Sequence, residues 1–83
     1  MEEKIQKLKE EGNYRIAEIH KIKRANDNRI LEVIVRCNFD GLLLLITDTY
    51  VPMNDLSIEH ICQVYRTSND GCCLIHYMRK AEC

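Results

Sequence analysis

The sequence is poor in residues that interrupt a chain, with one proline and three glycines among its 83 residues, and it has no tryptophan. Disordered and fibrous chains are enriched in proline and glycine, so this composition argues against both classes. Hydrophobic residues make up 46% and charged residues 30%, as is ordinary for a globular protein. We therefore expect a single domain over residues 1–83, with a small core and modest stability.

The chain also lacks a long apolar run and a surplus of charge. Its longest apolar stretch, 42–46, is far shorter than the roughly 20 residues of a membrane-spanning helix. The charged start, Met1-Glu2-Glu3-Lys4, is unlike a secretory signal. A net charge of −1 does not supply the cations that non-specific nucleic-acid binding requires. We expect a cytoplasmic protein with no membrane partner, and the balance of charge argues against nucleic acid.

Five cysteines are an odd number, and without a secretory signal they are expected to be free thiols. His60, Cys62, Cys72 and His76 would share one face if 58–66 and 72–79 formed a hairpin, which would make a zinc-stabilised module. Their spacing lacks the Cys-x-x-Cys pairs of recognisable zinc motifs. We therefore predict no metal and no cofactor, with the zinc module as an alternative.

Catalytic chemistry has little support in the sequence. A cysteine activated by a histidine would need an electropositive, partly exposed setting that no pattern indicates. The carboxylates are not paired at a spacing that would perturb their pKa values. We expect a protein that is not an enzyme.

The first part of the chain predicts a helix followed by two strands. Residues 2–11 are rich in helix formers, and Ile5 and Leu8 give this helix a narrow apolar edge. From Tyr14 the period changes to that of a strand, with a bulge near 18–20. A turn at 25–28 precedes a second strand whose odd-numbered residues, 31–37, face inward.

The clearest single feature is the hairpin turn Asn38-Phe39-Asp40-Gly41, because Asp-Gly tolerates the positive φ values of a tight turn. The strand that follows, 42–50, is apolar on both faces in its first half. Such a strand can be covered by helices above and below it, or it can form a homodimer interface. Pro52 ends it, since proline lacks the donor for the ladder.

The segment 56–66 fits two patterns, because its apolar residues match a helix after a cap near Asp55 and also alternate as in a strand. We predict a helix, since a sheet of three strands needs a cover. A turn at 67–71 and a final strand at 72–79 complete the chain. The predicted fold class is α+β: a small single domain with an N-terminal helix, an antiparallel sheet of three to five strands and a second helix around 56–66.

Charge divides the middle of the chain into a basic and an acidic segment. Residues 37–65 contain four acidic residues and neither lysine nor arginine, whereas the segment before them is basic. The basic residues are Lys21, Lys23, Arg24, Arg29 and Arg36. As an alternative function, they could form a small nucleic-acid-binding regulatory surface of the kind found on Sm-like or OB-like barrels.

The order of elements and the segment from Val35 to Gly41 resemble the small phage-encoded anti-CRISPR proteins that inhibit type II effector nucleases. In those proteins a strand enters an equivalent Asn-x-Asp-Gly turn, and a compact three-stranded sheet is packed with helices. The resemblance implies a phage protein acting in the host cytoplasm, whose Asn38, Asp40 and Gly41 reach into the nuclease. It covers about residues 3–46. The neutral net charge departs from the acidic, DNA-mimicking character of that group.

From these observations we expect a non-enzymatic protein-protein interaction module, an inhibitor that blocks a CRISPR-Cas effector if the resemblance holds. The turn joins the basic segment to the acidic one and presents an aromatic side chain, which makes it the best candidate contact. The predicted partner-binding residues are Asn38, Phe39, Asp40, Gly41, Asp48 and Asp55.

Overall fold

A computed structural model describes residues 14–80 of the chain. The predicted helix over 2–11 therefore lies outside the described residues. The described part contains five strands: β1 (Tyr14–Arg24), β2 (Ile30–Cys37), β3 (Leu43–Thr49), β4 (His60–Arg66) and β5 (Gly71–Arg79). It contains no helix long and apolar enough to cross a membrane.

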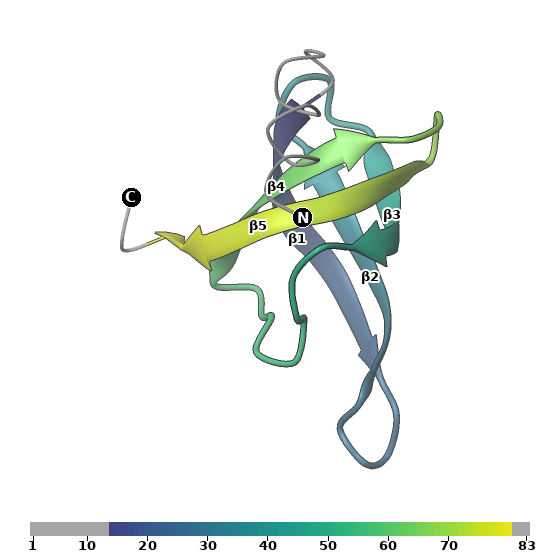
Figure 1. The fold of residues 1–83 in the computed structure, drawn as a ribbon, viewed down its shortest axis with the longest axis vertical. Helices are drawn as coiled ribbons and strands as arrows, with labels where there is room; N and C mark the ends of the chain where they lie inside the picture. The colour runs from purple at the N-terminus through teal and green to yellow at the C-terminus, as the bar shows by residue number, and fades with distance from the viewer. Residues whose placement is uncertain (1–13, 81–83) are drawn as a thin grey trace.

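The five strands close into a barrel in the order β1-β2-β3-β5-β4, with β4 returning to pair with β1 (Figure 1). The β3–β5 contact is parallel, and the other four contacts are antiparallel. The fold class predicted from the sequence is therefore wrong, because the described chain is an all-β domain with a mixed, closed sheet. Closure itself removes the need for covering helices, since the inner face of the sheet packs against itself.

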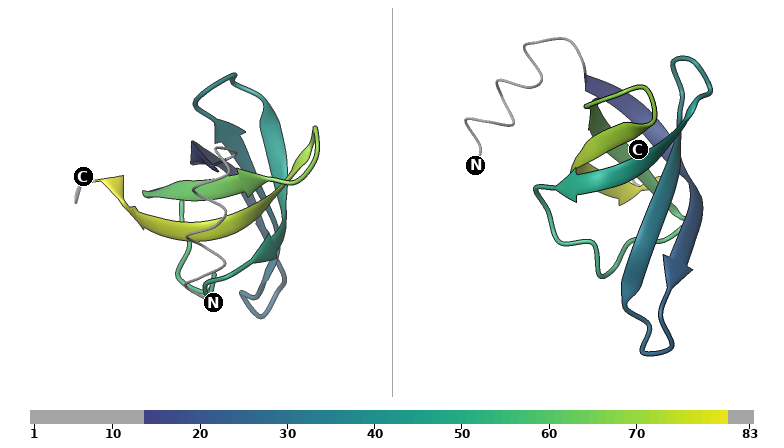
Figure 2. Two further views of the ribbon diagram at one scale, coloured as in Figure 1. Left: turned by 45° about the horizontal axis from the view of Figure 1, so that its top comes forward. Right: turned by 90° about the vertical axis from the view of Figure 1, so that its right-hand side faces the viewer.

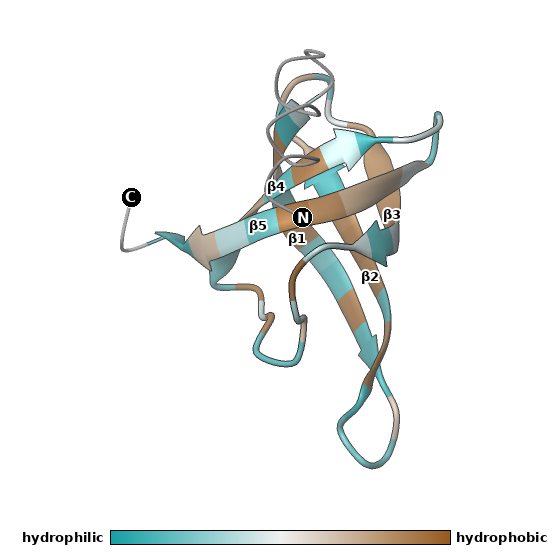
Figure 3. Ribbon diagram, viewed as in Figure 1, coloured by the Kyte–Doolittle hydropathy of each residue, from teal (hydrophilic) through white to brown (hydrophobic). Residues whose placement is uncertain are grey.

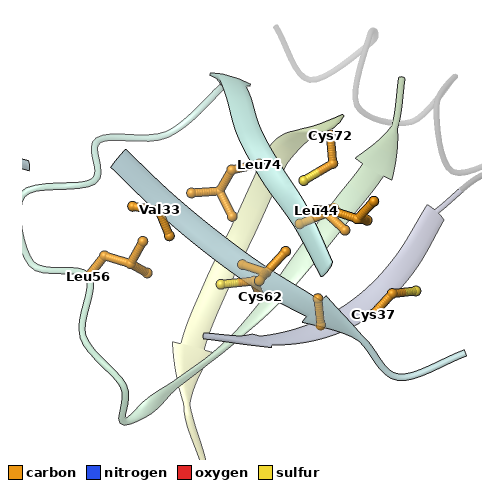
Figure 4. Close-up of a cluster of buried hydrophobic side chains, with 10 residues drawn as sticks. Val33, Cys37, Leu44, Leu56, Cys62, Cys72 and Leu74 are labelled. Atoms are coloured by element: carbon orange, nitrogen blue, oxygen red, sulfur yellow. The ribbon is translucent and has the colours of Figure 1, made fainter. Parts of the chain in front are cut away.

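The core lies inside the barrel and receives side chains from every strand. Alternate residues point inward, so that small cysteine and branched aliphatic side chains fill the interior (Figure 4). The buried cluster is Ala17, Val33, Val35, Cys37, Leu44, Leu56, Cys62, Val64, Cys72 and Leu74. In β2 the inward positions are Val33, Val35 and Cys37, as the alternation predicted, while Leu31 lies half exposed at the strand's start.

The segment 56–66 is not a helix. Leu56 is fully buried in the loop between β3 and β4, and β4 begins at His60. His60, Cys62 and Val64 then alternate inward, which is the strand pattern that the sequence left as the second alternative. The helical pattern of Ile58, Ile61, Cys62 and Tyr65 failed because these residues do not share one buried face. Cys62 is fully buried in β4, whereas Ile58 is exposed in the loop before it.

The β1–β2 hairpin is the longest ribbon of the barrel and projects beyond it (Figure 2). The register of this pair shifts between Ile19 and Lys21, which confirms the bulge predicted near 18–20. A bulge bends its strand, and here it follows the part of β1 that pairs with β4, which ends at Glu18, while the pairing with β2 continues to Arg24. The third predicted turn, 67–71, joins β4 and β5 as an antiparallel hairpin.

Candidate functional site

The outward positions of β1 and β2 and the first half of β3 form an ordered grid on one side of the barrel. The strand registers place Glu18 beside Arg36 and Arg36 beside Leu43, which is the first row. The second row is Lys21, Ile34 and Leu45. The third row pairs Lys23 with Glu32. We call these eight residues the leucine face: Glu18, Lys21, Lys23, Glu32, Ile34, Arg36, Leu43 and Leu45.

The β3 side of the leucine face is apolar and open to solvent. Leu43 is 46% exposed and Leu45 36% exposed, and Ile34 lies beside Leu45. The hydropathy colouring shows that β3 is hydrophobic (brown) at its start and hydrophilic (teal) at its end (Figure 3). Only the inner face of this strand is covered, through Leu44. These adjacent exposed aliphatic side chains make the face a candidate interaction surface.

The β1 side of the leucine face carries charge in an alternating arrangement. A side-chain nitrogen of Arg36 lies 3.8 Å from a carboxylate oxygen of Glu18. In the third row the order is inverted, because the cation, Lys23, is on β1 and the anion, Glu32, is on β2. The face thus has an apolar part bordered by charges of both signs, which is the usual composition of a protein interface.

The turn at 38–41 follows β2 at the end of the barrel where the first row lies. Gly41 has φ = +73°, which confirms the positive φ predicted for this position. Phe39 is 75% exposed, and the Arg15 guanidinium lies 4.6 Å from its ring centroid. Asn38 donates its backbone N–H to the carbonyl of Ile16, which ties the turn to β1.

Asp40 holds the turn to the rest of the barrel. Its carboxylate accepts the Leu42 N–H at 3.1 Å and pairs with the Arg66 guanidinium at 2.5 Å. The Leu42 N–H and Arg66 together hold the pKa of Asp40 below its ordinary value. Asp40 was predicted as a contact residue, but these bonds give it a structural role in joining the β2–β3 and β4–β5 turns.

An open cleft of about 360 Å³ lies beside this turn. Its lining residues are Arg15, Phe39, Arg66, Thr67, Ser68 and Asn69. The charge of Arg66 is compensated, because Arg66 pairs with Asp40 and also donates to the Asn69 carbonyl.

The other predicted contact residues are not gathered at the turn. Asp48 is exposed near the end of β3, about 16 Å along the strand from Leu43 at roughly 3.3 Å per residue. Asp55 lies in the loop before β4 and lines a second cleft of about 490 Å³ with His60, Tyr77, Met78 and Arg79. The structure brings Asn38, Phe39, Asp40 and Gly41 together and leaves these two aspartates elsewhere.

The basic segment is partly used for internal contacts. Arg24 donates to the carbonyls of Asn28 and Leu56, both at 2.9 Å, which fastens the β1–β2 hairpin to the loop before β4. Arg29 lies 3.9 Å from Asp27 in the turn, and Arg36 pairs with Glu18. Lys21 and Lys23 remain as exposed cations on the leucine face. The five residues thus do not form one phosphate-binding surface.

The residues of the zinc alternative do not share a face. Cys62 and Cys72 point into the core and His76 is exposed on the outside of β5. In the part of the chain that the structure describes, no three histidine, cysteine or acidic side chains are grouped to hold a metal ion. Burial raises the pKa of Cys62 and of Cys72 to about 12, so both thiols stay protonated at neutral pH and are poor nucleophiles.

None of the predicted partner-binding residues lies on the leucine face, although the sequence had suggested a homodimer interface as one way to cover the strand 42–50. The run 42–46 is apolar at every position, and only alternate residues can enter a barrel.

No family model matches the chain, and neither a curated protein nor a solved structure shows significant similarity to it.

Proposed function

We propose that this chain is a non-enzymatic protein-interaction domain that binds a protein partner through the leucine face. The observation that carries the proposal is the exposure of Leu43 and Leu45 beside Ile34, on a strand whose other face lies in the core. Covering these side chains would remove apolar surface from water, at about 25 cal/mol for each Å² buried. The charged border would then give the contact its orientation.

The position of the face within the barrel supports the same function. A strand order of 1-2-3-5-4 with a parallel contact between strands 3 and 5 is the arrangement of the OB-fold, whose ligands bind on the strand 2–3 surface. The leucine face occupies that surface. One fold hosts many unrelated functions, so the chemistry of the side chains on this surface must indicate what binds there.

That chemistry favours protein over nucleic acid. Single-stranded nucleic acids are held by aromatic side chains that stack on bases beside cations. The centre of this face is aliphatic instead, and Arg36, its arginine, lies beside Glu18. Aliphatic side chains bordered by mixed charges suit another protein surface.

The proposal names a protein partner and not a CRISPR-Cas effector. The resemblance to anti-CRISPR proteins implies a three-stranded sheet packed with helices, whereas the described chain is a closed barrel. Its segment from Val35 to Gly41 is the end of β2 and an internally bonded turn. An effector remains one partner that the capture experiment below can reveal.

The test compares capture of partners by three forms of the protein under reducing conditions. The face variant is Leu43→Ser with Leu45→Ser, and the matched control is Ile58→Ser, which removes an aliphatic side chain that is 68% exposed in the loop before β4. We expect the wild type and the control to bind the same partner, which can be another protein or a second copy of this chain. The face variant should lose this binding. All three forms should keep their circular dichroism spectrum, because the changed side chains are exposed. Equal binding by the face variant and the wild type would overturn the proposal.

A further inference from the structure

We infer that the partner on the leucine face is a second copy of this chain, related to the first by a two-fold axis that lies between the two faces, perpendicular to the strands. The inference rests on the proposed function and adds the identity of the partner. It is carried by the order of charges in the first and third rows, which are complementary to each other under this one operation. An isologous dimer requires such a surface, since the same patch serves both subunits.

The axis reverses the order of the rows and keeps each strand over its own copy. The first row of one subunit then faces the third row of the other subunit. Glu18 meets Lys23 of the partner subunit, and Arg36 meets Glu32 of the partner subunit. Because the relation is mutual, four pairs of opposite charge form across the interface.

The middle row lies along the axis and meets itself. Ile34 packs against Ile34 of the partner subunit, and Leu45 against Leu45 of the partner subunit. These contacts bury the apolar centre that the monomer leaves exposed. Lys21, at the β1 end of this row, also lies opposite its own copy, but its long side chain can turn its ammonium group into water at the rim.

The other in-plane two-fold axis, parallel to the strands, gives a poor match. It would place β1 over β3, so that Lys21 would cover Leu45 of the partner subunit and Glu18 would cover Leu43 of the partner subunit. It would also set Arg36 and Glu32 each against its own copy. Like charges in contact and charges on leucines both oppose association, so the rows select the perpendicular axis.

The test uses two half-swapped variants that keep every charge pair within the monomer. The first-row swap is Glu18→Lys with Arg36→Glu, and the third-row swap is Lys23→Glu with Glu32→Lys. Each variant keeps the composition of charge and the side-by-side pairing in its own row. In a homodimer of either variant, however, all four charge pairs across the interface become like-charged.

Molar mass is measured for each variant by light scattering after gel filtration under reducing conditions, from micromolar to millimolar chain. We expect the wild type to dimerise and each half-swapped variant to associate at least about tenfold more weakly. Mixing the two variants should restore a dimer containing one of each, because first-row and third-row charges are again opposite. The variant with all four substitutions should dimerise like the wild type. Dimers of either half-swapped variant as tight as the wild type would overturn the arrangement.

The same measurements separate this inference from the proposed function. A wild-type chain that stays monomeric over the whole range would overturn the dimer. If such a monomer still bound another protein, and Leu43→Ser with Leu45→Ser abolished that binding, the leucine face would stand with a different partner. If the same double variant formed dimers as tight as the wild type, both the face and the dimer would be wrong.

Discussion

Cys62 and Cys72 act as small apolar side chains that fill the barrel. Both are fully buried, and desolvation of the thiolate raises the pKa of each thiol from an ordinary value of 9.0 to about 12. A sequence with five cysteines suggests redox or metal chemistry, but burial removes the reactivity of these two thiols. Their role is packing, where a thiol is close in size to a small aliphatic group.

This burial predicts a loss of stability in alkali. The folded state keeps its thiol protons until about pH 12, whereas an unfolded thiol releases its proton near 9.0. Above pH 9 the unfolded state therefore binds fewer protons, and the free energy of unfolding falls as the pH rises from about 9 towards about 12. Urea unfolding at a series of pH values measures the slope. The double variant Cys62→Ala with Cys72→Ala should show a flatter profile, and a wild-type stability that is constant across this range would contradict the prediction.

The contacts of Asp40 predict a loss of stability when this residue is replaced and when the pH falls. Replacing Asp40 with Asn keeps an oxygen for the Leu42 N–H but removes the ion pair with Arg66, so the melting temperature should fall slightly, because the pair is partly exposed. Asp40→Ala removes both contacts and should lower the melting temperature further. The pKa of Asp40 is lowered by folding, so its contribution is present above the ordinary pKa and is lost as the pH falls through the folded value. Thermal unfolding at neutral pH should give the highest melting temperature for the wild type and the lowest for Asp40→Ala, and these differences should shrink as the pH is lowered into the acid range. Equal melting temperatures at neutral pH would contradict the prediction.

At the scale of elements, local patterns were sufficient for the hairpins. The alternation of Val33, Val35 and Cys37 and the Asp-Gly turn depend on neighbours within a few residues, and the structure confirms both. The segment 56–66 could not be resolved in this way, because a helix pattern and a strand pattern both fit it and both include Ile58 and Cys62. The choice was made by tertiary contacts, as β4 pairs with β1 on one side and with β5 on the other.

The β2–β3 turn gives the prediction at this scale. Gly41 has φ = +73° and open space where a Cβ would lie, so a substitution there meets backbone strain and no clash. We expect Gly41→Ala to cost about 1–2 kcal/mol. Gly41→Asn should cost less, because asparagine tolerates this conformation better than alanine. Urea unfolding measures the stability of both variants. A Gly41→Ala variant as stable as the wild type would contradict the strain expected at this position.

At the scale of the whole molecule, barrel closure was beyond the sequence patterns. The contacts that close it, β1 with β4 and β3 with β5, join segments that are far apart in the chain, and no local period encodes them. The leucine face depends on the same closure. Whether Leu43, Leu44 or Leu45 points outward is decided only when the strand's inner face is known, because a shift of one residue exchanges the two faces.

Leu56 carries the last prediction, because among residues 14–80 it is the one fully buried side chain outside the strands, and it packs into the core from the loop after β3. Leu56→Ala should lower the free energy of unfolding by about 2–5 kcal/mol, a large share of what a domain of this size has. Since all strands share one core, the loss should appear in a single transition, equally at the far end of the barrel. Coincident urea transitions by far-ultraviolet circular dichroism and by tyrosine fluorescence measure this, with Ile58→Ala as the exposed aliphatic control in the same loop. A Leu56→Ala variant that differs from the wild type no more than this control would show that the loop does not support the barrel.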